Sequence, residues 1–230
     1  MKVSVFFPAY NEEKNIEKIL HKTIEVMKKN NYTYEIGIVN DGSRDSTAER
    51  VLLMQQTDDR IKLINHPRNF GYAAATRTSF QNASGDVICV IDADDQYDLE
   101  EIPLLLSKIE EGFDLVVGYR KRIRDSTYRK ILSKGYNFIF KILFLTRFRD
   151  IDCGFRAIKK NAAEKISIKH SNVPVGAELF VRAFEKKLKI GQIPITHKFR
   201  VAGKSTFKFW KMPKTIFKIF MSVLLLRLKG

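Results

Sequence analysis

Residues 87–98, VICVIDADDQYD, are the most informative stretch of the chain. The first five are apolar and mostly β-branched, and a run of this kind that begins after a Ser-Gly pair is typical of a strand buried on both faces. The polar side chains that follow directly are Asp92, Asp94, Asp95 and Gln96. In an open parallel sheet, ligands bind beyond the carboxyl ends of the strands, so these side chains mark a candidate site.

Carboxylates crowded at one edge of a sheet repel each other unless a positive charge lies between them. A hard divalent cation supplies that charge, and the oxygen atoms of Asp and Gln suit Mg²⁺ or Mn²⁺. Asp92, Asp94 and Gln96 alternate in the sequence, so an extended backbone would direct all three to the same side. The simpler alternative is a water-exposed acidic turn, with Asp98 as the N-cap of the following helix. This stretch by itself leaves both interpretations open.

The composition indicates a folded domain that meets an anionic partner. The chain has 230 residues, of which 44% are hydrophobic, which is ample for one large core. The net charge of +15 favours nucleic acid, a phospholipid surface or a phosphorylated substrate as partner. The excess is local: residues 120–149 hold ten Lys or Arg and one acid, and residues 201–230 hold seven and none.

The two cysteines, Cys89 and Cys153, lie far apart and predict no disulfide framework, so we expect a reducing, cytosolic compartment. A strand is expected at residues 3–7, so we expect no signal peptide. Nowhere do eighteen apolar residues run without interruption, so no helix is expected to span a bilayer unaided.

Strands and helices are expected to alternate along the first half of the chain. The expected strands are 3–7, 34–39, 61–64, 87–91 and 114–118, and the expected helices are 12–29, 46–55, 72–82 and 99–111. Ser46 and Glu49 predict a capping box for the second helix. This order predicts a parallel α/β sheet with right-handed crossovers. Neither the dinucleotide fingerprint nor the phosphate-binding Lys loop is present in the sequence.

The second half is more basic and aromatic. We expect a helix at 128–148, a loop at 150–156 that enters a short strand, a helix at 175–187, a strand at 191–199 and a last helix at 212–229. Pro194 predicts that this last strand is bent or lies at an edge. The four histidines are scattered without metal-ligand spacing, so we expect them to be structural.

Several loops at or near the carboxyl edge carry a shared pattern: FPAYNE at 7–12, NDGS at 40–43 with DST at 45–47, and DAD at 92–94 with Gln96. In their order and spacing these stretches resemble the family 2 glycosyltransferases, which have the nucleotide-sugar-binding GT-A fold. Downstream, DIDCGFR at 150–156 and RVAGKS at 200–205 resemble the subgroup of polyprenyl- and dolichyl-phosphate sugar synthases. The resemblance covers residues 2–206.

The resemblance implies a role for each matching residue. A nucleotide-sugar donor would be bound by Pro8, Ala9, Tyr10, Glu12, Asp41, Asp92, Ala93, Asp94, Arg120 and Lys204. Mg²⁺ or Mn²⁺ on the donor diphosphate would be held by Asp92, Asp94 and Gln96, and the acceptor phosphate by Arg129, Ser133 and Arg200. The catalytic group would then comprise Asp92, Asp94, Arg129 and Arg200.

The implied activity is metal-dependent, inverting transfer of a hexose, mannose or glucose, from GDP-mannose or UDP-glucose to polyprenyl (dolichyl) phosphate. A phosphate monoester is largely ionised at neutral pH, since its second pKa is about 6, so it needs no general base. Residues 1–206 would form the catalytic domain, with 128–148 as an interface helix. Residues 207–230 would form a basic amphipathic helix on an anionic membrane, so that the protein is peripheral on the cytoplasmic face.

Three alternatives remain. A family 2 transferase that acts on a sugar hydroxyl would need a base, for which Glu178 is the nearest candidate. A nucleic-acid-binding module would explain the net charge, but the acidic edge argues against it and no nucleic-acid motif is present, so we expect no nucleic acid partner. A catalytically silent nucleotide-sugar sensor would have the same sequence features.

Overall fold

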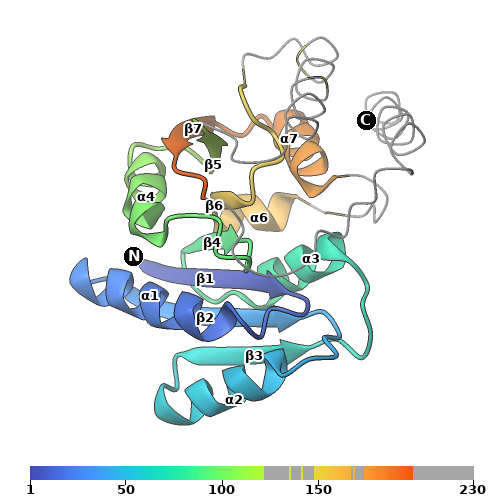
Figure 1. The fold of residues 1–230 in the computed structure, drawn as a ribbon. Coiled ribbons are helices and arrows are strands. Elements are labelled where there is room, and N and C mark those ends of the chain that lie inside the picture. The colour runs from blue at the N-terminus through green and yellow to red at the C-terminus, as the bar shows by residue number, and fades with distance from the viewer. Residues whose placement is uncertain (122–134, 136–140, 142–147, 167, 169–173, 199–230) are drawn as a thin grey trace.

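The computed structural model describes residues 1–121, 135, 141, 148–166, 168 and 174–198 (Figure 1). The strands are β1 (Lys2–Ala9), β2 (Thr33–Asn40), β3 (Ile61–Asn65), β4 (Val87–Ile91), β5 (Leu115–Arg120), β6 (Phe155–Lys159) and β7 (Ile190–Ile195). The helices are α1 (Ile16–Lys29), α2 (Thr47–Thr57), α3 (Tyr72–Asn82), α4 (Ile102–Glu110), α6 (Lys160–Lys165) and α7 (Val175–Glu185), and the 3₁₀ turn η1 (Leu99–Glu101) precedes α4. The helix expected at 212–229 lies outside the described residues, as does that at 128–148 except for three of its positions.

In the described part of the chain, seven strands form one sheet in the order β3-β2-β1-β4-β6-β5-β7. Neighbouring strands are parallel except around β6, which runs antiparallel to both β4 and β5. The predicted mostly parallel α/β sheet is therefore confirmed. Because β6 is reversed relative to both neighbours, β5 points in the same direction as β4. Strand β7, which contains Pro194, lies at the edge, as its proline predicts.

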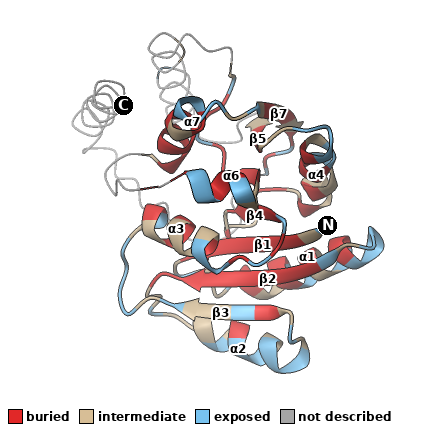
Figure 2. Cartoon of the chain, turned by 180° about the vertical axis from the view of Figure 1, so that it is seen from behind, coloured by how far each residue is buried: buried red, intermediate tan, exposed pale blue. Residues whose placement is uncertain are grey.

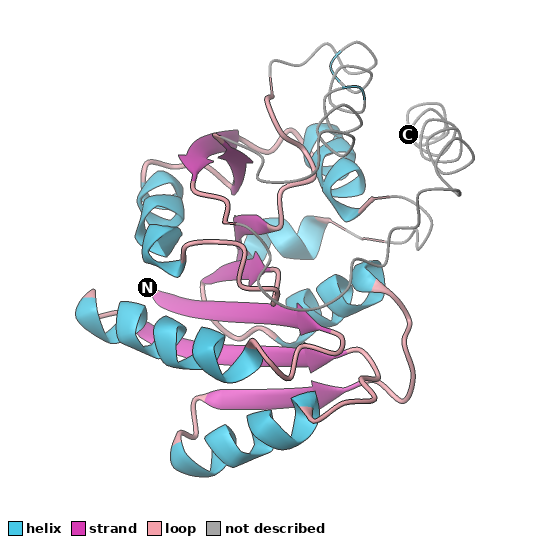
Figure 3. Ribbon diagram, viewed as in Figure 1, coloured by secondary structure: helices cyan, strands magenta, loops and turns pink. Residues whose placement is uncertain are grey.

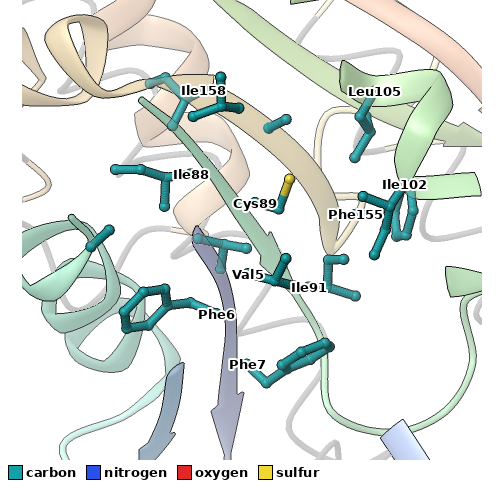
Figure 4. Close-up of a cluster of buried hydrophobic side chains, with 14 of the residues drawn as sticks. Val5, Phe6, Phe7, Ile88, Cys89, Ile91, Ile102, Leu105, Phe155 and Ile158 are labelled. Atoms are coloured by element: carbon teal, nitrogen blue, oxygen red, sulfur yellow. The ribbon is translucent and has the colours of Figure 1, made fainter. Parts of the chain in front are cut away.

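Strand β4 lies in the middle of the core. All five of its residues are buried, as the unbroken apolar run predicts. Figure 4 shows Ile88, Cys89 and Ile91 among apolar side chains of β1, β6 and α4. Burial raises the pKa of the Cys89 thiol to about 12, so this cysteine is a core side chain and not a nucleophile.

Strand β1 is longer than expected. It continues through Pro8 to Ala9, whereas the sequence predicts its end at Phe7. Pairing with β4 stops at Phe6, and from there to Ala9 the strand is paired only with β2. One side of β1 is then an edge, the setting in which a strand tolerates a residue without an N–H group.

Helices cover both faces of the sheet. Helices α1 and α2 pack on one face, and α3 packs on the other, nearer the viewer in Figure 2. The predicted apolar stripe of α1 is buried, but the helix begins at Ile16 and not at residue 12, because residues 12–15 form a separate turn. Figure 2 shows the inner strands β1 and β2 buried and the edge strand β3 partly exposed. No helix in the described ranges is long and apolar enough to cross a membrane.

The carboxyl ends of β1, β2 and β3 point to the same side of the molecule (Figure 3). The loops after these strands and after β4 meet at this edge. Since β6 runs the opposite way, its amino end lies at the same edge, where the N–H of Asp92 donates to the carbonyl of Gly154 (3.0 Å). This edge therefore gathers segments from both halves of the sequence.

Candidate functional site

The loops after β1 and β2 are hydrogen-bonded to each other. The N–H of Asn11 donates to Ser43 Oγ, and the N–H of Arg44 donates to Asn11 Oδ1, both at 2.9 Å. The N–H of Glu12 donates to Thr47 Oγ1 (2.9 Å). Asn11 has a φ of 57°, a left-handed conformation that Asn tolerates better than most residues. These polar residues of the glycosyltransferase-like pattern therefore hold the two loops in register.

Asp41, the residue expected to bind the nucleotide base, is 3% exposed. Its carboxylate accepts hydrogen bonds from the N–H groups of Phe70 (2.9 Å) and Gly71 (2.8 Å), and lies 2.7 Å from Nδ1 of His66. Asp41 thus fixes the loop after β3 against the end of β2. Gly42, with a φ of 68°, has no room for a side chain, because a Cβ would lie 2.4 Å from the backbone of Arg68.

Asp92 lies between Tyr72 and the start of β6. Its carboxylate accepts a hydrogen bond from the Tyr72 hydroxyl. On the other side, a Cβ at position 154 would lie 1.9 Å from Asp92 Oδ2, so glycine is required there for the carboxylate to occupy this place. Withdrawal from water raises the pKa of Asp92, although the Tyr72 hydrogen bond and the charge of Arg156 act in the opposite direction.

Arg156, the second residue of β6, brings a positive charge to Asp92. The side chain is 2% exposed, and its Nη2 donates to the Tyr72 hydroxyl oxygen (3.2 Å). Its Nε and Nη1 atoms have no hydrogen-bond partner among the described residues. Burial alone lowers the pKa of Arg156, but its neighbours, with Tyr72, Asp92 and Asp152 foremost, outweigh this and raise it, so the guanidinium stays charged. Tyr72 therefore links the arginine to the carboxylate.

The expectation that Asp92, Asp94 and Gln96 share one side of an extended backbone is wrong. Asp95 has a φ of 57°, which turns the chain, and Asp94 Oδ1 accepts from the N–H of Gln96 (3.2 Å). Lys18 of α1 forms an ion pair with Asp95. The side-chain nitrogen of Gln96 donates to the carbonyl of Lys198 (3.1 Å). The helix-cap interpretation of Asp98 is confirmed, because its side chain accepts from the N–H of Glu100.

The residues at this edge fit a divalent cation that takes some of its oxygen ligands from the protein and the others from water or a phosphate. Within the described ranges, no three His, Cys, Asp or Glu side chains are grouped so that they could hold a metal ion. Asp92 and Asp94 offer carboxylate oxygens from one loop, and the bond to Lys198 commits the nitrogen of Gln96 and not its oxygen. Mg²⁺ and Mn²⁺ accept such oxygen atoms and usually take others from water and phosphate.

The structure places the other expected donor residues as follows. Pro8 and Ala9 end β1, Tyr10 and Glu12 follow it, and Ala93 lies next to Asp92. The carboxylate of Glu12 accepts from the Asn15 side chain (2.7 Å). Arg120 ends β5 and pairs with Asp150. The roles of these residues toward a nucleotide stay predictions. Arg129, Ser133, Arg200 and Lys204 lie outside the described residues.

Two residues of this edge were not singled out from the sequence. Tyr72 begins the expected helix 72–82 and Arg156 ends the stretch 150–156, but nothing in the sequence indicates that the two side chains meet across 84 positions. Glu178, the base of the alternative with a hydroxyl acceptor, has 0% exposure on α7. A carboxylate with no exposed surface is poorly suited to take a proton from an incoming sugar, so the structure does not favour that alternative.

The fold defines the chain as an α/β protein with an open, mostly parallel sheet. Its acidic residues lie beyond the carboxyl ends of the parallel strands, where proteins of this class bind ligands. The chain belongs to the family described as "Glycosyl transferase family 2", whose model matches residues 4–167. It is similar to the undecaprenyl-phosphate 4-deoxy-4-formamido-L-arabinose transferases of Salmonella choleraesuis and Salmonella newport, each 34% identical over 215 residues. The alignment covers 92% of this chain and 64% of each relative, so the chain spans less than two thirds of their length.

Solved structures with the same fold include glucosyl-3-phosphoglycerate synthase from Mycobacterium tuberculosis. Its complex with phosphoglyceric acid has a TM-score of 0.74 at 19% identity, covering 98% of this chain and 79% of that one. Its complex with Mn²⁺ and UDP-glucose also gives 0.74 at 19%, covering 98% and 78%. At this identity the likeness concerns the fold, which is of the GT-A type, as expected.

Proposed function

We propose that the chain transfers a sugar from a nucleoside-diphosphate sugar to undecaprenyl phosphate or a related polyprenyl phosphate. The observation that carries this proposal is the gathering of Asp41, Asp92 and Asp94 at one sheet edge, with the buried charge of Arg156 beside them. The relatives that are 34% identical are named for transfer to undecaprenyl phosphate, which supports this class of acceptor.

The donor would lie across the loops after β1, β2 and β4. In this proposal Tyr10, Glu12 and Asp41 lie toward the base and ribose, and Asp92, Asp94 and Gln96 hold Mg²⁺ or Mn²⁺ against the diphosphate. The cation would stabilise the negative charge of the departing nucleoside diphosphate. The solved structure with Mn²⁺ and UDP-glucose, although it shares only the fold, supports a divalent cation and a uridine nucleotide as the first choices to test.

The acceptor phosphate would attack the sugar directly. A phosphate oxygen forms the bond to the anomeric carbon while the bond from that carbon to the diphosphate oxygen breaks, which inverts the anomeric configuration. The ionised phosphate has no proton that must be removed. It needs positive charge so that two anions can approach, and Arg129, Ser133, Arg200 and Lys204 are the residues proposed to supply it together with hydrogen bonds.

The protein would work as a peripheral protein on the cytoplasmic face of a membrane. Residues 207–230 are apolar with interspersed basic residues, Lys208, Lys211, Lys214, Lys218, Arg227 and Lys229. Each basic residue near an anionic surface contributes about 1 kcal/mol. Binding to phosphatidylglycerol vesicles should weaken as salt rises, and replacing the six with Gln should weaken it further. Unchanged flotation in high salt, or by the six-fold variant, would contradict this.

The decisive experiment is a donor panel. UDP-glucose, GDP-mannose and UDP-4-deoxy-4-formamido-L-arabinose are each incubated with the protein, undecaprenyl phosphate, vesicles and Mn²⁺ or Mg²⁺, and radiolabelled lipid is scored. We expect lipid-linked sugar from one donor and none without undecaprenyl phosphate. Transfer to a saccharide acceptor and never to lipid phosphate would favour the hydroxyl-directed alternative, and donor binding without any transfer would favour a sensor.

A further inference from the structure

Three consecutive residues, Phe70–Tyr72, contact two carboxylates of the acidic edge, those of Asp41 and Asp92. The N–H of Phe70 donates to Asp41 Oδ1 (2.9 Å) and the N–H of Gly71 donates to Asp41 Oδ2 (2.8 Å). The next residue, Tyr72, donates its hydroxyl hydrogen bond to Asp92. Asp41 lies directly after β2 and Asp92 directly after β4, so one short segment joins two loops that are separated by β1.

We propose that Phe70–Tyr72 couples the position of Asp41 to that of Asp92, and that Tyr72 is a positioning residue for the Asp92 carboxylate. The inference rests on the proposed function only in taking Asp92 as a metal ligand. A ligand that binds at the Asp41 end would therefore, through this segment, change the position of the Asp92 carboxylate oxygens.

The hydrogen bonds around Tyr72 allow one arrangement. An arginine only donates, so the Tyr72 oxygen accepts from Arg156 Nη2 and its own proton is directed to Asp92. Arg156 is 2% exposed and its Nε and Nη1 have no partner in the described part of the chain. The bond to Tyr72 is therefore the side-chain hydrogen bond that the described residues provide to this buried charge, and the other donors of Arg156 are costly to leave unpaired.

Asp92 is confined on the opposite side as well. The space where a side chain at 154 would lie is filled by Asp92 Oδ2, and the N–H of Asp92 is bonded to the carbonyl of that same Gly154. With β6 on one side and Tyr72 on the other, the carboxylate has a fixed place. Carboxylates that bind metals depend on such outer hydrogen bonds, and removing one typically lowers metal affinity about 10- to 100-fold.

The coupling itself is tested without metal, by amide hydrogen exchange of the 230-residue chain. Tyr72→Phe removes one hydroxyl from a residue that is 39% exposed and takes a hydrogen bond from Arg156, but the guanidinium keeps the nearby charges of Asp92 and Asp152, so we expect the variant to fold. Exchange at the N–H groups of Phe70 and Gly71 should become at least about tenfold faster, because these amides stay bonded to Asp41 only while the segment is held at both ends. Tyr32→Phe, on the loop before β2, is the matched control and should change neither amide. Unchanged exchange in Tyr72→Phe would overturn the coupling.

The positioning role is tested by Mn²⁺ binding, followed by electron paramagnetic resonance with Mn²⁺ alone and with Mn²⁺ and UDP. Tyr72→Phe should bind Mn²⁺ about 10- to 100-fold more weakly than the wild type, and Tyr32→Phe should bind it equally well. Equal affinity of Tyr72→Phe and wild type would overturn the positioning role. A wild type that binds no Mn²⁺ in either condition would count against the metal assignment in the proposed function, and the exchange experiment would still decide the coupling.

Discussion

The guanidinium of Arg120 and the carboxylate of Asp150 form a two-pronged ion pair, with Nε 2.7 Å from Oδ2 and Nη2 3.1 Å from Oδ1. Asp150 is 5% exposed, and the pair joins the end of β5 to the loop before β6. Burial lowers the pKa of Arg120, but Asp150 outweighs this and raises it. Arg120 therefore has a structural partner besides the donor role that the sequence resemblance implies.

Replacing Arg120 tests which of these roles dominates. Arg120→Ala leaves a buried carboxylate without its partner and should lower the free energy of unfolding by about 3–5 kcal/mol. Arg120→Lys should recover only part of this, because a single ammonium cannot replace a planar two-pronged donor. Urea unfolding gives the values, with Arg44→Ala on the exposed loop as control. A normal unfolding curve with a raised KM for the donor would show that Arg120 serves mainly the ligand.

Removal of the proposed metal ligands is expected to stop transfer without unfolding the chain. Asp92→Asn and Asp94→Asn should each lower kcat at least about 100-fold, since charge stabilisation of this kind is commonly worth 2.7–4 kcal/mol or more. EDTA should act in the same way and be reversed by Mn²⁺. Asp59→Asn, an exposed carboxylate elsewhere, is the control. Full activity in EDTA would refute the metal.

Gly154→Ala should displace Asp92, because the added methyl group would lie 1.9 Å from its Oδ2. We expect transfer and Mn²⁺ affinity to fall at least about tenfold. The matched control is Gly118→Ala on β5, whose Cβ would meet Ile195 side-chain atoms at 3.0–3.1 Å, away from Asp92. If both variants lose activity equally, the loss reflects general crowding and not the position of Asp92.

The two arginines that we propose to bind the acceptor phosphate, Arg129 and Arg200, have the same expected kinetic signature. Arg129→Ala or Arg200→Ala should cost about 2–4 kcal/mol of transition-state stabilisation in transfer to lipid phosphate. Hydrolysis of the donor by water should suffer less, because water brings no phosphate charge. Kinetics of both reactions are compared in each variant. Equal losses would assign the two arginines to the donor instead.

Near the amino end of β2, on the side of the sheet away from the acidic site, Glu35 is a buried carboxylate that no pattern in the sequence singles out. It accepts hydrogen bonds from Ser4 Oγ (2.5 Å), from the N–H and hydroxyl of Ser84 (2.6 and 2.7 Å), and from Lys62 Nζ (2.8 Å). Burial alone raises the pKa of Glu35, but these donors outweigh it and lower the pKa to about 2. Glu35 thus ties β1, β2, β3 and the residues before β4 together.

The lowered pKa makes the stability of the chain depend on pH. A carboxyl whose pKa is lower in the folded state contributes stability above its unfolded pKa, near 4.5, and loses it as the pH falls through the folded value of about 2. The shift corresponds to about 3 kcal/mol. Glu35→Gln should therefore be less stable than wild type by about that amount at pH 7, with the difference shrinking between pH 4.5 and 2. Glu49→Gln, an exposed control, should show no such convergence in urea titrations.

Local signals predicted much of the fold. Helix α3 runs over residues 72–82 as expected, and β4 has the expected bounds, because a turn glycine and an unbroken apolar run mark them in the sequence. The insertion of reversed β6 between β4 and β5 was not predicted, since strand pairing over long separations leaves no local pattern.

The site was predicted in its location more than in its contacts. The capping box at Ser46 and Glu49 is wrong: the Ser46 side chain makes no capping bond, and Asp45 accepts from the N–H of Thr47 instead. Asp, Asn and Ser compete for such local bonds, and the tertiary contact of Ser46 N–H with Glu13 decides between them. The left-handed turn at Asp95 was equally hidden, because Asp is compatible with both strand and turn.

The reversed strand β6 has a consequence for how the protein folds. Ile91 pairs with Phe155, 64 positions further along the chain, so Gly154 and Arg156 reach the acidic edge only after a long loop has closed. Contacts of such high sequence separation form slowly, because chain entropy is lost before any contact is gained. We therefore expect the β1–β4 part to gather its carboxylates first, without their internal counter-charge. Docking of β6 would then be a late folding step, which brings Arg156 and Asp152 to this edge together.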